Sequence, residues 1–487
     1  MLAGLNPIGS MTRGRVPRAA ARLHRAGALA CMTAALLAAC SLGPRYHKPD
    51  VPPPDHWVTA SDPAAAQWPS TDWWHGFNSP DLDALISEAQ RANDDLRAAV
   101  ARVQQADAQR RIAAAPLFPA LDVSAQATRA RAPVPPSGAY LTGNTYNPLL
   151  TASYQLDFFG KNRALLAAAT ATAHASRYDR TTVELTVLAG VATTYFQALE
   201  LRDRLSVANS NLANASQVLH GLELEERAGI ATALDVAQQR TVVATVNASI
   251  PPLREQLRQS LDALAILIGS TPEAVDVTSG GLDTVGQPAV RPGLPSELLA
   301  RRPDVAAAEA QLMAANADIA AARAAIFPSI NLTADGGYES AALATLLTPA
   351  SRVWSLGAGL TQPIFHGGAL LGGYSLAKAQ YQELLADYHK AVISALANVE
   401  DALVAVQQTA EQVTRQQQAT EEARRAYRFA QVQMHAGTIN VLTLLNTETT
   451  LFTAEDALAQ AKYAHLQSLV SLYQALGGGW QQKDEPL

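Results

Sequence analysis

Alternating apolar and polar residues mark four short segments of the chain. In each segment an apolar residue occupies every second position, and polar or small residues fill the positions between. The alternating apolar residues are Leu121, Val123, Ala125 and Ala127; Leu150, Ala152, Tyr154 and Leu156; Ile330, Leu332, Ala334 and Tyr338; and Trp354, Leu356, Ala358 and Leu360. A period of two is typical of a β-strand with one apolar and one polar face. The pattern therefore predicts two β-hairpins.

Two long segments instead carry apolar residues with a helical period. Residues 177–228 and 374–436 contain no proline and little glycine, and at ~1.5 Å per residue each would be too long for a single globular core. Heptad positions are held by Leu205, Leu212 and Leu219 in the first, and by Val392, Val399, Val406 and Val413 with Leu396, Leu403 and Ala410 in the second. Such heptads predict coiled-coil packing of helix on helix. An Ala-Gly pair ends each segment, so a second helix is expected to run back along each.

The two halves of the chain repeat each other at an offset of about 208 residues. The matching strings are Phe118-Pro119-Ala120-Leu121 with Phe327-Pro328-Ser329-Ile330, Gln155-Leu156-Asp157-Phe158-Phe159-Gly160 with Gln362-Pro363-Ile364-Phe365-His366-Gly367, Ala228-Gly229 with Ala436-Gly437, and Ile268-Gly269 with Leu476-Gly477. Each copy orders two strands and then two long helices. Because only two copies exist, this is an internal duplication and not a solenoid array.

The first 40 residues predict export and lipid attachment. Five arginines precede a short apolar run, residues 26–39, which ends in Leu37-Ala38-Ala39-Cys40. The run is too short to span a membrane and has the flanks of a secretory signal. Its end matches the bacterial lipobox, so Cys40 is expected to carry an N-acyl diacylglycerol; an ordinary signal peptide with an incidental cysteine is the alternative. Ser41 lacks the aspartate that marks inner-membrane retention, and translation could equally begin at Met11.

Removal of the signal would leave an acidic chain with one cysteine. Of 37 basic residues five lie in the signal, so 32 remain against 43 acidic ones, a formal net charge of −11. A basic face for nucleic acid is therefore not expected. A single cysteine cannot form an internal disulfide. The acidic balance favours a lumen or surface that tolerates cations better than anions.

The strands and the signal together favour an outer-membrane barrel. A half-buried sheet of a soluble domain would explain any one strand. Four strands in two matched hairpins behind a lipoprotein signal favour strands that are apolar toward lipid and polar toward water. Four strands cannot close a barrel, because sheets that span a bilayer have no free edges and the smallest closed barrels have eight strands. Several copies of the chain are therefore expected to share one barrel.

These elements divide the chain into consecutive segments. The predicted segments are a lipoprotein signal peptide (1–39), a lipidated N-terminal segment with the first helices (40–119), transmembrane β-hairpin 1 (120–157), periplasmic helical hairpin 1 (158–269), a linker or equatorial segment (270–300), a helix (301–327), transmembrane β-hairpin 2 (328–364), periplasmic helical hairpin 2 (365–477) and a C-terminal tail (478–487).

Several motifs of the mature chain also carry a family likeness. They are Trp73-Trp74 with Phe77, Leu82, Leu85 and Asn93; Leu298 to Val305, with Ala308-Glu309 and Ala322 to Pro328; Asn398 to Leu403; and Ala436-Gly437 followed by Leu442 to Leu445. The first resembles the opening helix, and the second the most diagnostic string, of the TolC/OprM-like outer membrane factors of tripartite efflux systems. The NodT-type lipoprotein branch is the most similar. In structural terms, Pro303 and Asp304 predict only a helix N-terminus.

The resemblance implies a mixed fold class, all-α plus membrane β, with an internally duplicated protomer of a homotrimer. Three copies of four strands would form one 12-stranded outer-membrane β-barrel. A long periplasmic α-barrel would continue it, with the remaining helices in an equatorial region. The implied location is the outer membrane of a Gram-negative bacterium, in contact with lipid and extending into the periplasm.

The sequence favours transport over catalysis. It has no catalytic motif, no paired metal-ligand spacing and no nucleotide-binding loop, so neither an enzyme nor a cofactor is expected. The main interpretation is a passive export duct for small molecules such as drugs. A duct has no energy source, so an inner-membrane RND-type pump and a periplasmic adaptor are expected partners, and the pump is expected to select the substrate. The alternatives are a protein-secretion duct working with an ABC exporter and a structural envelope lipoprotein.

The resemblance also places a periplasmic gate just after the second Ala-Gly turn. The corresponding residues are Leu442, Thr443 and Asn446, and Asp235 lies nearby in the first copy. Asn446 stands at a commonly acidic position, and three amides in a symmetric ring would bind divalent cations far more weakly than three carboxylates. The alternative is that Asn446 faces a neighbouring helix. The tips marked by Gly229 and Gly437 are expected to contact the adaptor.

Overall fold

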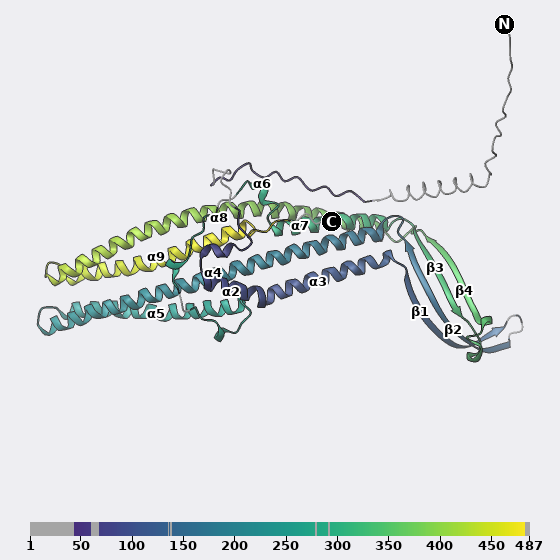
Figure 1. Cartoon of the computed structure of the whole chain (residues 1–487), viewed down its shortest axis with the longest axis horizontal. Coiled ribbons are helices and arrows are strands. Elements are labelled where there is room, and N and C mark those ends of the chain that lie inside the picture. The colour runs from purple at the N-terminus through teal and green to yellow at the C-terminus, as the bar shows by residue number, and fades with distance from the viewer. Residues whose placement is uncertain are drawn as a thin grey trace, which may run out of the picture. The chain divides into compact units, whose positions relative to one another are not determined.

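A computed structural model describes residues 43–59, 68–134, 136, 139–277, 280–290 and 293–482. Cys40 and the predicted signal peptide lie outside these residues. The chain divides into two compact units. One unit comprises residues 1–45, 112–167 and 316–379, and the other comprises residues 46–111, 168–315 and 380–487. The first unit contains the sheet and the second contains most of the helices (Figure 1).

The sheet of the first unit has four antiparallel strands in chain order. They are β1 (Ala120–Val134), β2 (Ala139–Leu156), β3 (Ser329–Tyr338) and β4 (Arg352–Thr361). Both pairs of strands lie within the predicted hairpins. β2 also pairs with β3, so the hairpin of the first copy lies beside that of the second in one continuous sheet. β1 and β4 are the edge strands, each with a neighbour on one side only within this protomer.

The register of the strands places the predicted apolar residues on one face of the sheet. Leu121 pairs with Ala152, Ala152 with Ala334, and Ala334 with Leu356. Directly paired residues point to the same side, and successive residues along a strand point to opposite sides. The predicted alternation is therefore confirmed. This apolar face is open in the protomer, and the side chain of Trp354 on it is 77% exposed.

The opposite face carries a polar row across the same strands. Asp122, Thr151, Asp335 and Ser355 lie side by side in the register. The hydroxyls of Thr151 and Ser355 each donate a hydrogen bond of 2.8 Å to a different carboxylate oxygen of Asp335. These bonds tie β2, β3 and β4 together through side chains as well as backbone. The two faces thus have the opposite polarities that a strand between lipid and water requires.

Each copy then contributes one long and one shorter helix of equal size. The long helices α4 (Lys161–Arg227) and α8 (Ala369–His435) have 67 residues each, and the shorter α5 (Ala233–Leu267) and α9 (Val441–Ala475) have 35 each. Both long helices begin before the proline-free segments 177–228 and 374–436, within the predicted helical hairpins 158–269 and 365–477. The backbone N–H groups of Asn162 and Arg163 donate to the carboxylate of Asp157, which caps α4 as soon as the strand ends.

The buried seams of the long helices differ partly from the predicted ones. Val392 and Val399 are fully buried as expected, but Ala410 is exposed. Of the predicted second seam, Leu403 is buried and Leu396 is half-buried, and Ala395 and Ala402 are buried beside them. In α4 the most buried heptad is Leu201, Ala208, Ala215 and Leu222, beside the half-buried Leu205, Leu212 and Leu219. Small alanines at these positions let neighbouring helices approach closely, a preference that a search for large apolar residues misses.

The remaining helical elements are shorter. They are η2 (Trp73–Phe77), α2 (Pro80–Ala92), α3 (Asp94–Ala114), η3 (Ala115–Leu117), η4 (Pro272–Ala274), η5 (Leu282–Thr284), α6 (Pro295–Leu298), α7 (Pro303–Ala324), η6 (Leu343–Thr345) and η7 (Pro349–Ser351). The predicted first helices of the 40–119 segment are the 3-10 turn η2 followed by α2 and α3. Asn93 has an extended backbone and breaks the helix between them. α7 begins at Pro303, as its sequence predicts.

The same helix junction occurs once in each copy. The side-chain amide of Asn93 donates to the C=O of Leu267, at the end of α5, over 2.8 Å. The guanidinium of the buried Arg302 donates to the C=O of Ala475, at the end of α9, also over 2.8 Å. Leu267 and Ala475 are equivalent in the duplication (475 − 267 = 208). Each side chain satisfies a carbonyl that the helix end would otherwise leave unpaired. The Arg302 segment of the diagnostic string therefore has a structural role.

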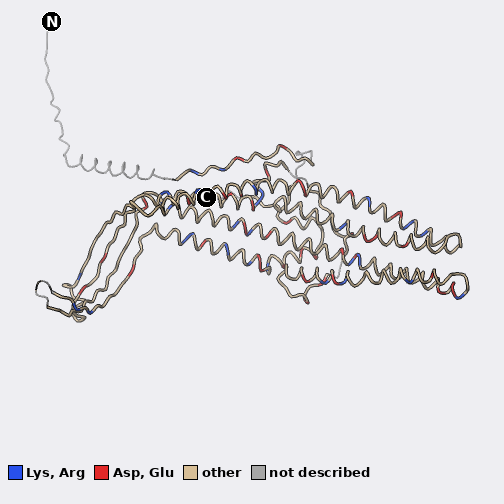
Figure 2. The backbone as a smooth tube through the Cα atoms, turned by 180° about the vertical axis from the view of Figure 1, so that it is seen from behind, with Lys and Arg blue, Asp and Glu red and all other residues tan. Residues whose placement is uncertain are grey.

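Charged residues of both signs alternate along the helices instead of gathering in one block (Figure 2). The aromatic residues of the opening segment pack into the helical core: Trp73 stacks on Tyr473 of α9 with ring centroids 5.0 Å apart, and Phe77 contacts Phe196 of α4. Among the described residues, no helix is both long and apolar enough to cross a membrane.

Candidate functional site

The tips of the two helical hairpins contain the residues that the sequence assigns to a gate and an adaptor contact. Gly229 and Gly437 make the turns with φ of 76° and 69°. The N–H of Ile230 donates to the C=O of Glu225, and the N–H of Thr438 to that of Gln433. These bonds close Schellman turns, whose left-handed residue favours glycine. A Cβ would have open space at either glycine, so conformation alone selects it.

The first turn of each returning helix is capped by its own side chains. In α5, Thr232 and Asp235 form a capping box: the Asp235 N–H donates to the Thr232 hydroxyl, and the Asp235 carboxylate accepts from the Thr232 N–H. The Thr232 hydroxyl also donates to this carboxylate over 2.7 Å, and it lowers the pKa of Asp235 together with the Thr232 N–H. In α9, the N–H and hydroxyl of Thr443 both donate to the Asn440 side chain. Asp235 and Thr443 thus occupy equivalent positions in the two copies, and each takes part in the N-terminal cap of its helix.

The other two predicted gate residues are open in the protomer. Leu442 is 51% exposed and Asn446 is also exposed, one turn further along α9. The equivalent of Leu442 in the first copy, Leu234, is exposed as well. Within the described part of the chain, no group of three or more His, Cys, Asp or Glu side chains could hold a metal ion.

Apolar contacts join the two hairpins directly above the tips. Leu222 of α4 and Val236 of α5 pack with Val441 and Leu445 of α9 in one buried cluster. α9 also packs on α8 through Leu444 and Leu451. The two copies therefore meet along α4 and α9, and the exposed Leu442 lies beside this contact.

A buried polar cluster interrupts these contacts. Glu448 of α9 and Gln239 of α5 have no exposed side-chain surface. The amide of Gln239 donates to the C=O of Ala215 over 2.8 Å and to the Glu448 carboxylate over 3.4 Å. The hydroxyl of Tyr427 and the second carboxylate oxygen of Glu448 make no hydrogen bond within the described residues. Burial raises the pKa of Glu448, and the Gln239 amide and the nearby Tyr427 hydroxyl oppose this only in part.

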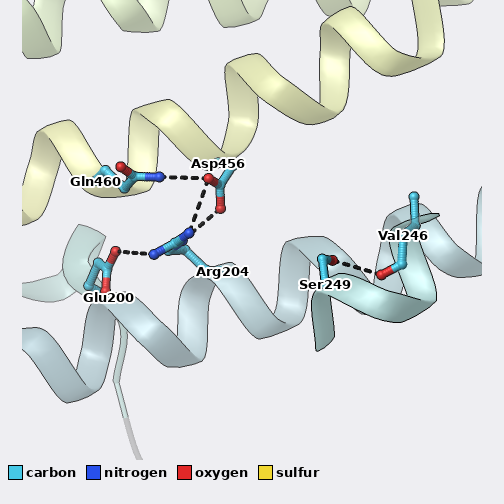
Figure 3. Close-up of polar contacts among 6 residues, drawn as sticks. All are labelled: Glu200, Arg204, Val246, Ser249, Asp456 and Gln460. Atoms are coloured by element: carbon cyan, nitrogen blue, oxygen red, sulfur yellow. Dashed lines mark hydrogen bonds and ion pairs between the residues drawn. The ribbon is translucent and has the colours of Figure 1, made fainter. Parts of the chain in front are cut away.

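An ion-pair network holds the hairpins together further from the tips. Figure 3 shows Arg204 of α4 between Glu200 of the same helix and Asp456 of α9. Its Nε lies 2.6 Å from Asp456 Oδ1, and its Nη1 lies 3.1 Å from Glu200 Oε1. Gln460 donates to the same aspartate. Burial raises the pKa of Glu200 while the neighbouring Arg204 lowers it. This network and the Glu448 cluster both fix α9 against the other hairpin.

α5 differs from α9 beside this network. It contains Pro251 and Pro252 within the helix, where α9 has Ala459 and Gln460 at the equivalent positions. Neither proline can donate a backbone hydrogen bond. The hydroxyl of Ser249 donates to the C=O of Val246 in this stretch (Figure 3). A cavity of about 360 Å³ lies here, lined in part by Val246, Pro252 and Phe452.

The matches to known proteins follow the same duplication. The family model described as "Outer membrane efflux protein" matches residues 85–270 and 294–478, one segment in each copy. The chain belongs to the outer membrane efflux protein family. The predicted family is thereby confirmed. The structure is also similar to a solved one, the outer-membrane channel OprN, with a TM-score of 0.86, 30% identity and coverage of 91% of this chain and 100% of that chain.

Two relatives of this efflux family extend over nearly the whole chain. The pyoverdine export outer membrane protein OpmQ of Pseudomonas aeruginosa is 40% identical over 454 residues, covering 92% of this chain and 95% of the relative. The toluene efflux pump outer membrane protein TtgC of Pseudomonas putida is 33% identical over 463 residues, covering 93% and 95%. Both are outer-membrane efflux components. The predicted channel function and outer-membrane location are confirmed at the level of the family.

Sequence reasoning missed the Glu448 cluster and the Arg204 network. A signal for the first was present, because Glu448 stands among Leu444, Leu445 and Leu451 on the buried side of α9. A charged residue within an apolar stripe is unusual enough to single out. The second carries no comparable signal, since arginine and aspartate on long helices are most often solvated.

Glu448 predicts a pH-dependent contact between the hairpins. Because its pKa is raised in the folded state, the neutral acid stabilises the contact below the ordinary glutamate pKa near 4.5, and this stabilisation is lost as pH rises through the folded-state value. Glu448→Gln should remove the dependence and raise the stability by roughly 1–3 kcal/mol above the folded-state pKa of Glu448, where the native side chain is a buried, poorly paired carboxylate. Thermal unfolding at pH 5 and pH 8 measures it. The exposed Glu422→Gln is the control, and equal pH dependence in Glu448→Gln and the native protein would refute the assignment.

Proposed function

We propose that this chain is the export duct of a tripartite efflux pump, a passive conduit and not an enzyme. It assembles as a homotrimer in the outer membrane and works with a periplasmic adaptor and an inner-membrane pump. The observation that carries this function is the combination of an open-edged sheet, apolar on one face and polar on the other, with two matched pairs of folded-back helices. A secretion duct or a structural lipoprotein gains no separate support from these features.

The cargo is set elsewhere in the pump. Two relatives that match more than nine-tenths of this chain are named for different cargos, pyoverdine and toluene. If the duct itself selected the cargo, each of these similar chains would need a binding site specific for its own cargo. The described cavities of the helical unit instead lie between helices, at packing contacts such as that of Arg204 with Asp456. The proposed cargo class is small molecules in general.

Two surfaces of the chain attach it to its surroundings. Acylation of Cys40 would add a lipid anchor in the outer membrane. The hairpin tips around Gly229 and Gly437 would meet the adaptor. Ile230, Phe429 and Val432 support this role, because each is an apolar side chain more than 65% exposed near a tip. Exposed apolar side chains gathered in one region are typical of a surface that another protein covers.

Export by whole cells tests the proposed duct. A host that lacks its own outer-membrane efflux channel would express this chain with a pump and adaptor from the same gene cluster. Because the duct completes the path across the envelope, accumulation of a dye that the pump transports should fall several-fold relative to cells without the chain. The matched control expresses pump and adaptor alone. Unchanged accumulation, with the chain present in the outer-membrane fraction, would contradict the proposed duct.

We also propose that Leu442, Thr443 and Asn446 line the periplasmic entrance. Leu442 and Asn446 are exposed on α9, although Thr443 and Asp235 are engaged in their helix caps. Three-fold symmetry would triple any charge there, and amides hold divalent cations weakly. The native channel should therefore resist block by divalent cations.

Asn446→Asp tests this entrance. Three carboxylates in a narrow passage should bind Mg²⁺ or Ca²⁺ and reduce the single-channel conductance in planar bilayers when the cation is added on the periplasmic side. Asn209→Asp, at an exposed position of α4 further from the hairpin tip, is the matched control. Strong block of the native channel, or no new block in Asn446→Asp, would show that Asn446 does not determine the charge of the entrance.

A further inference from the structure

The apolar face of the sheet ends in arginines. The register between β1 and β2 is continuous from Ala120↔Ser153 to Val134↔Ala139, so alternate residues of β1 keep the same face along the whole strand. The row that begins with Leu121 and Val123 therefore continues to Arg129 and Arg131. Both arginines are exposed. The guanidinium carbon of Arg131 lies 4.9 Å from the ring centroid of Tyr140, a residue of the same face on β2.

A third arginine occupies the same face on the other edge strand. Arg352 begins β4 and lies in the row of Trp354, Leu356 and Leu360. It stands eight residues from Leu360, the last apolar residue of its row (360 − 352), and Arg129 stands eight residues from Leu121 (129 − 121). On both edge strands an arginine therefore lies eight residues from the apolar residue at the other end of its row, Leu121 on β1 and Leu360 on β4. Figure 2 shows blue residues gathered where the strands end away from the helices.

Charge is divided strictly between the two faces. The strands contain two acidic residues, Asp122 and Asp335, and both lie on the polar face. The apolar face contains the three arginines and no carboxylate along the described strands. Aromatic side chains mark the border between its apolar and basic parts: Tyr146, Tyr338 and Trp354. A positive charge that faces lipid without a protein partner needs an anion from outside the sheet.

The depth of these arginines matches that of lipid phosphates. The ten residues from Leu121 to Arg131 span about 34 Å along the strand at ~3.4 Å each, or about 26 Å across the bilayer for a tilt near 40°. Arg129 and Arg352, eight residues from the start of their rows, lie about 5 Å short of that depth, a gap that an extended arginine side chain spans. The apolar band of an outer-membrane barrel is about 25 Å tall and is bordered by aromatic girdles. Guanidinium groups bind phosphate with two parallel hydrogen bonds. The strand ends opposite the arginines lead into the helices, so the arginines belong to the outer leaflet.

Arg352 and the β1 arginines lie on opposite edges of one protomer. Closing the barrel places β4 of one copy beside β1 of the next, about 4.8 Å away. We propose that Arg129, Arg131 and Arg352 form, across each seam between copies, a binding site for the phosphate groups of an outer-leaflet lipid. The lipid would then bridge two protomers and stabilise the trimer. This inference rests on the proposed outer-membrane trimer.

The thermal stability of the purified trimer tests the site. Dissociation in detergent is followed with and without lipid A carrying both phosphates. The lipid should raise the dissociation temperature of the native trimer by several degrees, since it binds the trimer and not the separated chains. The triple variant R129Q/R131Q/R352Q should lose most of this increase. R415Q/R425Q/R428Q removes three exposed arginines of α8 instead and should respond as the native protein does.

Three further arms make the result specific. Dephosphorylated lipid A should give little stabilisation, and free inorganic phosphate at the same concentration should give none. R129K/R131K/R352K keeps the charges and should retain part of the effect, which separates loss of phosphate binding from misfolding. Equal stabilisation of the R→Q variant by lipid A, or full stabilisation by inorganic phosphate alone, would overturn the lipid site. Single-channel conductance reports the duct independently: a native trimer that conducts but gains no stability from lipid A would refute only this inference and leave the proposed duct standing.

Discussion

Backbone hydrogen bonding at two strand edges determines the assembly of this protein. β1 and β4 each leave one row of N–H and C=O groups without a partner in the protomer. Each such group costs several kcal/mol when it faces hydrocarbon. The open apolar face shows that the sheet is made for that environment. The edges must therefore pair with each other across copies, so this requirement makes assembly obligatory, and membership of the outer membrane efflux protein family gives the number of copies as three.

The two helical hairpins of each protomer are held together by contacts between their side chains. Each protomer supplies two hairpins, and they contact each other through Leu222, Leu445 and the Arg204–Asp456 ion pair. These contacts combine an apolar seam with polar groups that are expensive to bury. Such a mixture holds the two hairpins in one arrangement. It also leaves titratable groups, above all Glu448, buried between the hairpins, where a change of charge alters the contact of one hairpin with the other. The duplication thus gives two similar but not identical hairpins, one with Pro251 and Pro252 and one without.

Local patterns allowed much of the fold to be predicted from sequence. The alternation at Leu121 and Val123 specifies the faces of a strand because its period depends only on neighbouring residues. The heptad at Val392 and Val399 does the same for a helix. The contact of Arg302 with Ala475 and that of Gln239 with Glu448 join residues 173 and 209 positions apart, so no local pattern encodes them. The gate was located only through resemblance, and the entrance at Asn446 remains a prediction.

The mass of the detergent-purified protein tests the central requirement most directly. Light scattering, with the detergent contribution subtracted, should give a single species of three protomers, because only pairing between copies satisfies the edges of β1 and β4. Circular dichroism on the same sample would report whether the strands are intact. A monodisperse monomer that retains its full strand content would show that the four-stranded sheet tolerates free edges, and it would contradict the account.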